Sequence, residues 1–166
     1  NFNVVCGQGT ICVELVEQIK NPDIIMAPIG GGGLLSGTAI AAKNLWADMI
    51  VLGAEPAIAN DACLSFQSKK LVPVQSTNTI ADGLRTSLSP FTYSIISQYV
   101  NNILNCSENA IVEAMKLVFQ YLKIVIEPSS AVPLACILEN RERFSKKKVA
   151  IILSGGNVDL ANLPFK

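Results

Sequence analysis

A run of four glycines, Gly30 to Gly33, stands between an apolar stretch and an alanine-rich one, and it constrains the fold most. Residues 23–29 have the length and composition of a buried strand, and residues 34–46 have those of a helix. Residues 49–54 and 148–153 repeat the strand pattern. Apolar strands separated by helices predict a three-layer α/β fold, a mostly parallel sheet with helices on both faces.

Weaker patterns fill the rest of the chain. We expect helices over 59–68, 91–100 and from 108 to about 121, a short strand over 102–106, and a polar loop over 72–89. Ser107 can cap the third of these helices. Ser129 or Ser130 can cap a further helix, with Pro133 tolerated near its first turn. Residues 2–6 are expected to pack as a strand.

The composition excludes several classes of function. The 166 residues predict one domain, half of them are apolar, and 13 basic side chains balance 13 acidic ones. Zero net charge argues against a partner that is nucleic acid or an anionic membrane surface, and no apolar run is long enough to span a bilayer. The absence of histidine excludes a Ser-His-Asp triad and histidine-ligated zinc within this chain.

The cysteines indicate a reducing compartment, which we take to be the cytoplasm. They are five in number, widely spaced, and include no Cys-x-x-Cys pair, so a disulfide framework or a zinc cluster is not expected. We expect them to be small buried hydrophobic residues: Cys6, Cys12, Cys63, Cys106 and Cys136. Only 16% of the residues are charged, which indicates that this chain buries apolar surface against a further protein segment.

The glycine run has the properties of a phosphate site. Glycines let the backbone approach a ligand, and the following helix N-terminus adds free amides and a positive dipole end. The dinucleotide fingerprint fails because Ser36 stands at its third glycine, and the Walker pattern fails because Thr38 stands in place of lysine. A phosphomonoester held by backbone amides is therefore favoured; the alternative, a tight turn, would need only one or two glycines.

Two other strand ends carry polar side chains. Glu55 ends a strand and Asp61 opens the next helix, so their carboxylates can converge on one hard cation. In the alternative, Asp61 merely lies near a helix N-terminus and Glu55 forms a surface ion pair. Ser154 ends the last strand before two glycines, and it is either a ligand-facing hydroxyl or part of an ordinary turn. The stretches 81–83 and 127–130 are candidate ligand loops or turns.

Taken together, these motifs resemble serine racemase and the related serine/threonine dehydratases, pyridoxal-phosphate enzymes of the tryptophan-synthase-β fold type. The resemblance covers essentially the whole chain, and it rests on residues 7–10 (GQGT), 30–37 (GGGGLLSG), 55–56 (EP), 81–83 (ADG), 127–129 (EPS) and 154–159 (SGGNVD). It implies the large domain of that fold and a pyridoxal-phosphate cofactor.

The resemblance also implies roles for single residues. The cofactor phosphate would be held by the backbone amides of Gly30, Gly31, Gly32, Gly33 and Leu34, and the pyridine nitrogen by Ser154. The divalent-cation site of the racemase branch, which takes Mg²⁺, Mn²⁺ or Ca²⁺, matches Glu55, the Ala59 carbonyl and Asp61. Bacterial-type catabolic threonine dehydratases lack that acidic pair. The positions that contact an activating nucleotide, ATP, at the dimer interface match Lys123 and Asn157.

One motif of the family is absent. No Ser-x-Lys-x-Arg-Gly sequence provides a Schiff-base lysine, so we assign no catalytic residue to this chain and expect it to be inactive alone. We expect residues 1–166 to be a single domain, the C-terminal large-domain portion of a longer enzyme, completed by its N-terminal part and assembled as a homodimer.

The activity implied by the resemblance is racemisation of serine, or elimination of ammonia from serine or threonine, with these small amino acids as substrates. One alternative is a threonine or 3-hydroxyaspartate dehydratase without racemase activity. Another is a non-catalytic half-enzyme that keeps a phosphate or metal site.

Overall fold

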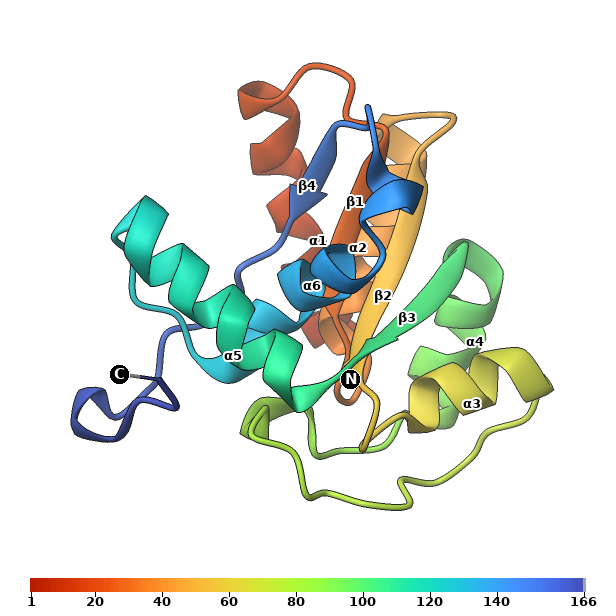
Figure 1. Ribbon diagram of the computed structural model, residues 1–166. Helices are drawn as coiled ribbons and strands as arrows, with labels where there is room; N and C mark the ends of the chain where they lie inside the picture. The colour runs from red at the N-terminus through yellow and green to blue at the C-terminus, as the bar shows by residue number, and fades with distance from the viewer. Residues whose placement is uncertain (166) are drawn as a thin grey trace.

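The computed structural model describes residues 1–165, and it forms a parallel sheet with helices on both faces (Figure 1). The elements in chain order are α1 (Phe2–Gln18), β1 (Ile24–Pro28), α2 (Gly33–Leu45), β2 (Ile50–Pro56), α3 (Asp61–Ser68), α4 (Pro90–Tyr99), β3 (Asn102–Cys106), α5 (Glu108–Leu117), α6 (Pro128–Glu139) and β4 (Val149–Ile151). The predicted three-layer α/β fold is confirmed.

The sheet has the strand order β3-β2-β1-β4, and every neighbouring pair is parallel. All five residues of β1 are buried, because β1 has a strand on each side and helices over both faces. A strand in that position can be apolar at every residue, which explains why its continuous apolar run could be recognised in the sequence. The carboxyl ends of all the strands meet at one edge of the sheet, where the candidate site lies.

Each face of the sheet has its own hydrophobic core, because successive side chains of a strand point to opposite faces. Ile25 and Ala27 of β1 pack with residues of α1 to α4 on one face. Ile24 and Met26 pack with residues of α5 and α6 on the other. The helices therefore divide into two layers around the sheet, α1 to α4 on one side and α5 with α6 on the other.

Most predicted elements lie within two residues of the observed ones. Ser107 caps α5, since its hydroxyl accepts a hydrogen bond from the Ala110 amide at 3.2 Å. The helix then continues as one π-helical turn over Val118–Leu122. The expected loop over 72–89 contains a single 3-10 turn at Asp82–Leu84 and is otherwise irregular.

The predicted capping of α6 by Ser129 or Ser130 is wrong. The helix begins at Pro128, whose fixed φ suits the first helical position and whose missing amide needs no partner there. The two serine hydroxyls instead bond to distant turns, Ser129 to the Gly83 amide and Ser130 to the Gly155 amide. Pro133 lies inside the helix rather than in its first turn.

The predicted strand over residues 2–6 is also wrong, because these residues begin α1. The helix packs closely on α2 through glycine. A Cβ atom on Gly37 would lie 2.3 Å from the Val5 carbonyl oxygen and 2.6 Å from the Gly9 amide nitrogen. The GQGT motif at 7–10 thus belongs to a backbone-to-backbone helix contact, which offsets the poor helix propensity of its glycines.

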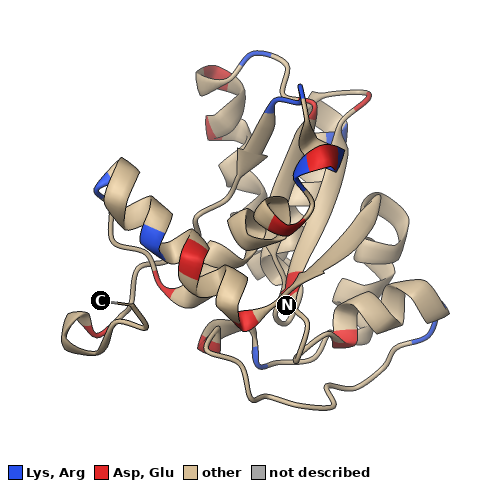
Figure 2. Ribbon diagram, viewed as in Figure 1, with Lys and Arg blue, Asp and Glu red and all other residues tan. Residues whose placement is uncertain are grey.

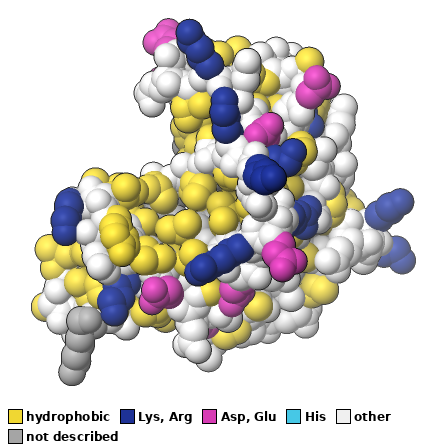
Figure 3. Space-filling model, turned by 45° about the horizontal axis from the view of Figure 1, so that its top comes forward, with side chains coloured by type: hydrophobic (Ala, Val, Ile, Leu, Met, Phe, Trp, Pro, Cys, Tyr) yellow, Lys and Arg dark blue, Asp and Glu magenta, His cyan; other side chains and the backbone are white. Residues whose placement is uncertain are grey.

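Charged residues lie mainly on the outer helices and loops (Figure 2), and hydrophobic side chains gather on the side where α5 and the C-terminal segment lie (Figure 3). Four of the five cysteines are buried as expected, but Cys6 is exposed on α1, which corrects the prediction for that residue. In residues 1–165, no helix combines the length and the apolar character that a membrane crossing requires.

Candidate cofactor and cation site

A cavity of about 200 Å³ lies at the carboxyl ends of β1 and β4. Its lining residues come from four separate stretches of the sequence: Pro28, Gly30, Gly31, Gly32, Gly33, Leu34, Gly83, Leu84, Glu127, Ser129 and Ser154. All six residues predicted to contact a cofactor are in this set. The fold therefore brings the glycine run and Ser154 to one place, although more than a hundred residues separate them in the chain.

The glycine run forms one wall of the cavity. Gly32 precedes α2 with a φ of +82°, in the left-handed region, and a Cβ atom there would lie 2.6 Å from Leu88 Cδ2. Thr92 of α4 donates a hydrogen bond from its hydroxyl to the Gly31 carbonyl at 2.9 Å, which fixes the run from the side of α4. A side chain at Gly32 would both strain the backbone and displace this packing.

The amides of this wall are free for a ligand. Within residues 1–165, the backbone N–H groups of Gly30 to Leu34 donate to no backbone carbonyl. These amides lie at the N-terminus of α2, a helix of 13 residues. The dipole of this helix favours negative charge at this end. Free amides, a side-chain-free wall and a helix N-terminus together form a site for a phosphate group.

Ser154 lies on the β4 side of the same cavity and is solvent-exposed. The following residue is fixed by Ser130, whose hydroxyl accepts from the Gly155 amide and lies 2.7 Å from both the amide nitrogen and the carbonyl oxygen of Gly155. The arrangement presents a neutral hydroxyl to the cavity that the glycine wall also lines. The segment 154–155 is more than an ordinary turn, because Ser130, a buried side chain of α6, holds Gly155 in place.

The first turn of α6 links two cavity walls, and this link was not predicted. Ser129 accepts a hydrogen bond from the Gly83 amide at 3.0 Å, while Ser130 holds Gly155. Glu127 lines the cavity and accepts from the Asn157 amide at 3.0 Å. Sequence analysis singled out the stretch 127–130 as a possible ligand loop or turn, but it gave Ser129 and Ser130 only the role of helix cap and gave Glu127 none.

Glu55 is buried, with 2% of its surface exposed, which excludes the alternative of a surface ion pair. Its carboxylate accepts hydrogen bonds from the Ala62 and Cys63 amides at 3.0 and 2.9 Å, in the first turn of α3. Burial, with a smaller contribution from the neighbouring Asp61, raises the pKa of Glu55 to about 8, although the two amides oppose the change. The protonated form of Glu55 is therefore favoured, because burial disfavours the negative charge of the carboxylate.

Asp61 is 1% exposed, and both of its carboxylate oxygens are buried without a hydrogen-bond partner in residues 1–165. Burial raises the pKa of Asp61, and the nearby amides of Leu88 and Asp61 itself offset only part of this effect. Two buried carboxylates close enough to repel each other, one of them unpartnered, fit a divalent cation with oxygen ligands. Ala59, the third predicted ligand, is buried in the turn between them.

Lys123 and Asn157, the predicted nucleotide contacts, lie in two exposed segments that run side by side. The Glu127 amide donates to the Gly155 carbonyl at 3.1 Å, and a Cβ on Gly156 would lie 2.7 Å from the Val125 carbonyl. Lys123 follows the π-helical turn with a φ of +58°. These segments connect the outer surface to the cofactor cavity through Glu127.

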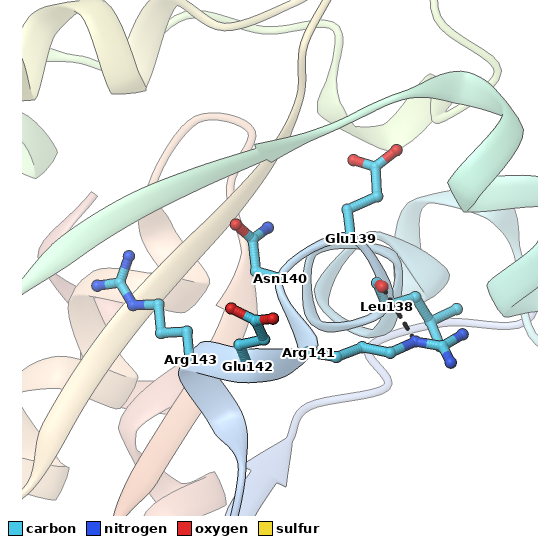
Figure 4. A pocket seen from close by; sticks show the side chains of 6 residues that line it. All are labelled: Leu138, Glu139, Asn140, Arg141, Glu142 and Arg143. Atoms are coloured by element: carbon cyan, nitrogen blue, oxygen red, sulfur yellow. Dashed lines mark hydrogen bonds between the residues drawn. The ribbon is translucent and has the colours of Figure 1, made fainter.

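Other features of the molecule do not assemble chemistry. A cavity of about 500 Å³ is lined only by the consecutive residues Leu138–Arg143, and Figure 4 shows their charged side chains extending in different directions. Glu139 turns away to hold the N-terminus of α5 through Ser107, at 2.6 Å between the oxygens. The described residues contain no cluster of three or more Cys, Asp or Glu side chains suited to a metal ion. No lysine of these residues lines the cofactor cavity.

Comparison with known proteins agrees with this arrangement. Residues 1–155 match the model of the pyridoxal-phosphate dependent enzyme family. The chain is 46% identical over 162 residues to a β-hydroxyaspartate dehydratase of Paracoccus denitrificans, covering 98% of this chain and 51% of the relative.

Two solved structures resemble the fold closely. The serine racemase of Dictyostelium discoideum superimposes with a TM-score of 0.89 at 49% identity, covering 96% of this chain and 52% of that one. The serine racemase of maize gives a TM-score of 0.90 at 42% identity, covering 95% of this chain and 49% of that one.

The chain thus spans about half the length of the curated relatives that it matches. The match extends over the glycine wall, the acidic pair and the first turn of α6, which are the parts that form the candidate site. With this coverage and these identities, the chain belongs to the pyridoxal-phosphate dependent enzyme family.

Proposed function

We propose that the protein carrying this chain is a pyridoxal-phosphate-dependent serine racemase that also eliminates ammonia from L-serine or L-threonine. The chain would contribute the cup for the cofactor phosphate, the partner of the pyridine nitrogen and a divalent-cation site. The observation that carries the racemase assignment is the buried pair of Glu55 and Asp61, with both oxygens of Asp61 unpartnered in the part of the chain that the structure describes. The likeness to serine racemases supports it.

Pyridoxal phosphate, when bound, withdraws electrons from the α-carbon of an amino acid and so acidifies its α-proton. The residues of the cavity suit this group. The amides of Gly30 to Leu34 would bind the phosphate oxygens, and the glycine wall would leave room for close approach. Ser154, which lines the same cavity, would bond to the ring nitrogen.

A hydroxyl at this position has a chemical consequence. Ser154 is neutral, so it cannot keep a ring nitrogen protonated in the way that a carboxylate does. Electron withdrawal is then weaker, and loss of a β-hydroxyl competes well with return of a proton to the α-carbon. We therefore infer that elimination accompanies racemisation. Since no lysine of residues 1–165 lines the cavity, we propose that the catalytic lysine is supplied by another part of the protein.

The cation would neutralise Glu55 and Asp61 and hold the first turn of α3 in place. Mg²⁺ is our first candidate, with Mn²⁺ or Ca²⁺ as substitutes, because carboxylate and carbonyl oxygens are the ligands that these ions prefer. The Ala59 carbonyl would be the third protein ligand. A cation here would support the fold near the cofactor cavity rather than take part in proton transfer.

We further propose that ATP binds at Lys123 and Asn157 as an activator, at the interface of a homodimer. Both residues are exposed, and the neighbouring Tyr121 and Leu122 are 70% and 59% exposed, so a second copy of the protein would bury apolar surface here. The free cysteines agree with a cytoplasmic location.

One relative favours a second candidate. The 46% identity to a β-hydroxyaspartate dehydratase supports a dehydratase that acts on 3-hydroxyaspartate and lacks racemase activity. An assay with each substrate separates the two candidates.

The test is an assay of the full-length protein on L-serine, L-threonine and L-threo-3-hydroxyaspartate, with D-serine and 2-oxo acids measured separately. We expect D-serine and pyruvate from L-serine, both stimulated by Mg²⁺, and loss of that stimulation in Asp61→Ala. Turnover of hydroxyaspartate alone would establish the second candidate. No turnover of any substrate by protein loaded with the cofactor would indicate a non-catalytic binding protein.

A further inference from the structure

A third buried oxygen without a partner lies near the acidic pair. In residues 1–165, Oδ1 of Asn105 is buried and has no hydrogen-bond donor, like both carboxylate oxygens of Asp61. Asn105 belongs to β3, the strand next to β2, while Asp61 is the first residue of α3. Buried acceptors are normally paired, so two residues with unpaired oxygens in one region call for a common explanation.

The sheet register brings Asn105 to Glu55. The two residues are direct partners in the parallel ladder of β2 and β3, so their side chains project from the same face of the sheet. That face is the one covered by α3. Ile103, two residues earlier on β3, packs in the core of that face together with Cys63 of α3, whereas Cys106 packs on the opposite face.

The first turn of α3 completes the arrangement. The Cys63 amide donates to Glu55 Oε2 at 2.9 Å, and the Asn105 side chain lies near the Cys63 thiol, whose pKa burial raises and Asn105 lowers. Asn105 therefore lies against the same helical turn that Glu55 caps and that Asp61 begins. Its unpartnered oxygen is a neutral, hard acceptor beside two buried carboxylates.

We propose that Asn105 is an outer-sphere residue of the cation site, its carbonyl oxygen accepting a hydrogen bond from a water bound to the divalent cation. This rests on the proposed cation site of Glu55, Asp61 and the Ala59 carbonyl. Mg²⁺ and related ions keep several waters when few protein ligands are present, and those waters need acceptors. Hydrogen-bond partners of this kind orient the ligand shell and contribute strongly to affinity.

The proposal explains why a polar side chain occupies this strand position. An apolar residue would satisfy the packing against α3 without leaving a buried acceptor unpaired. The oxygen has a use only if a donor reaches it, and a cation-bound water supplies one from the direction of Asp61. Because Asn105 is neutral, it adds an acceptor without increasing the repulsion between Glu55 and Asp61.

The test is a Mn²⁺ titration of the full-length protein, followed by the electron paramagnetic resonance of free Mn²⁺ and by the thermal midpoint at each concentration. We expect Asn105→Leu, which preserves size, to weaken Mn²⁺ binding by about 10- to 100-fold. Asn102→Leu is the matched control at the far end of β3, where the side chain instead bonds to the Ile103 amide, and its Mn²⁺ affinity should equal that of the wild type.

Asp61→Asn separates this proposal from the one on which it rests. If Asp61→Asn abolishes binding while Asn105→Leu binds like the wild type, the role of Asn105 is overturned and the cation site stands. If Asp61→Asn binds Mn²⁺ like the wild type, both are overturned.

A second substitution keeps the proposal testable should Asn105→Leu fail to fold. Asn105→Asp retains an oxygen at the same position and adds negative charge, so we expect it to bind Mn²⁺ at least as tightly as the wild type. A weaker affinity in Asn105→Asp than in the wild type would contradict an acceptor role.

Discussion

Gly32 is the residue at which the phosphate cup depends most directly on the lack of a side chain. Its φ of +82° is unfavourable for any other residue, and the nearest atoms to an added Cβ, at 2.6 to 3.0 Å, come from Leu88, Thr92 and Ile96. These neighbours belong to the loop before α4 and to α4 itself, so a substitution would disturb the wall and its support together.

We predict that Gly32→Ala lowers the free energy of unfolding by at least about 2 kcal/mol, from backbone strain and overpacking together. The affinity for pyridoxal phosphate should fall as well. Gly7→Ala is the matched control, because a Cβ there meets nothing within 4 Å. It lies in the interior of α1 and should stabilise by about 0.5–1 kcal/mol. Urea unfolding measures both effects, and equal effects of the two substitutions would contradict the argument.

The cysteines differ sharply in their surroundings, which gives a second prediction. Cys6 is exposed, whereas burial raises the pKa of the Cys12 thiol from its ordinary 9.0 to about 11. At pH 8, iodoacetamide should modify Cys6 in the native protein and leave Cys12 unmodified, as peptide mass spectrometry would reveal. Rapid native labelling of Cys12 would refute the burial that the packing of α1 on α2 creates.

The same shift makes stability depend on pH. Between pH 9 and 11 the unfolded chain loses the Cys12 proton while the native chain keeps it, so the free energy of unfolding falls as pH rises. The loss from this group should be about 1 kcal/mol at pH 10 relative to pH 8. Cys12→Ala should lose this part of the pH dependence, which urea unfolding at the two pH values would measure.

At the scale of elements, the N-terminal cap of α4 contributes to the stability of the fold. Ser89 accepts from the Thr92 amide at 3.1 Å, and the Thr92 hydroxyl accepts in return from the Ser89 amide at 3.0 Å. Pro90 follows as the first helical residue. This reciprocal capping box fixes the start of α4, and through Thr92 it also supports Gly31 of the phosphate cup.

We predict that Ser89→Ala destabilises the protein by about 1 kcal/mol, because the Thr92 amide at the start of α4 loses its acceptor. Ser94→Ala, at an exposed position of the same helix, should change stability by less than about 0.5 kcal/mol. Thermal unfolding of the two variants gives the comparison. A loss in Ser94→Ala as large as that in Ser89→Ala would contradict the assignment of the cap.

Elements whose pattern is local were predictable, and those determined by distant contacts were not. The central strands are apolar at every position, and Ser107 is followed by a clear amphipathic helix, so both were found. The helix α1 was missed because its glycines lower helix propensity, and the contact with Gly37 that compensates lies far along the chain. The hydroxyl of Ser130 was assigned to a cap because Gly155, its actual partner, is 25 residues away.

The candidate site divides in the same way. The glycine cup and Ser154 follow strand ends, where parallel sheets bind ligands, so their positions could be predicted from the sequence. The participation of Glu127 and Asn105 could not, because it depends on which turns and strands become neighbours. The strand pairing of Asn105 with Glu55 is not encoded in any local pattern.

At the scale of the whole molecule, the cavity holds a cup for a phosphate and a hydroxyl for a ring nitrogen, and its lining within the described residues contains no lysine. We predict that residues 1–166 alone, incubated with pyridoxal phosphate and then borohydride, acquire no label at any single lysine in stoichiometric amount. Mass spectrometry of tryptic peptides is the measurement. Stoichiometric labelling of one lysine would show that this chain supplies the amine itself.

The first turn of α6 has a consequence for the order in which the site can form. It ties Gly83 to Ser129 and Gly155 to Ser130, so part of the cavity lining depends on segments spread between residues 83 and 155. During synthesis on the ribosome, the glycine run emerges before these segments, and β1 and β2 can pair. The Ser130–Gly155 contact cannot form until residues 154–155 have left the exit tunnel. The complete cofactor cavity therefore forms only after β4, the last strand of the sheet, has been made.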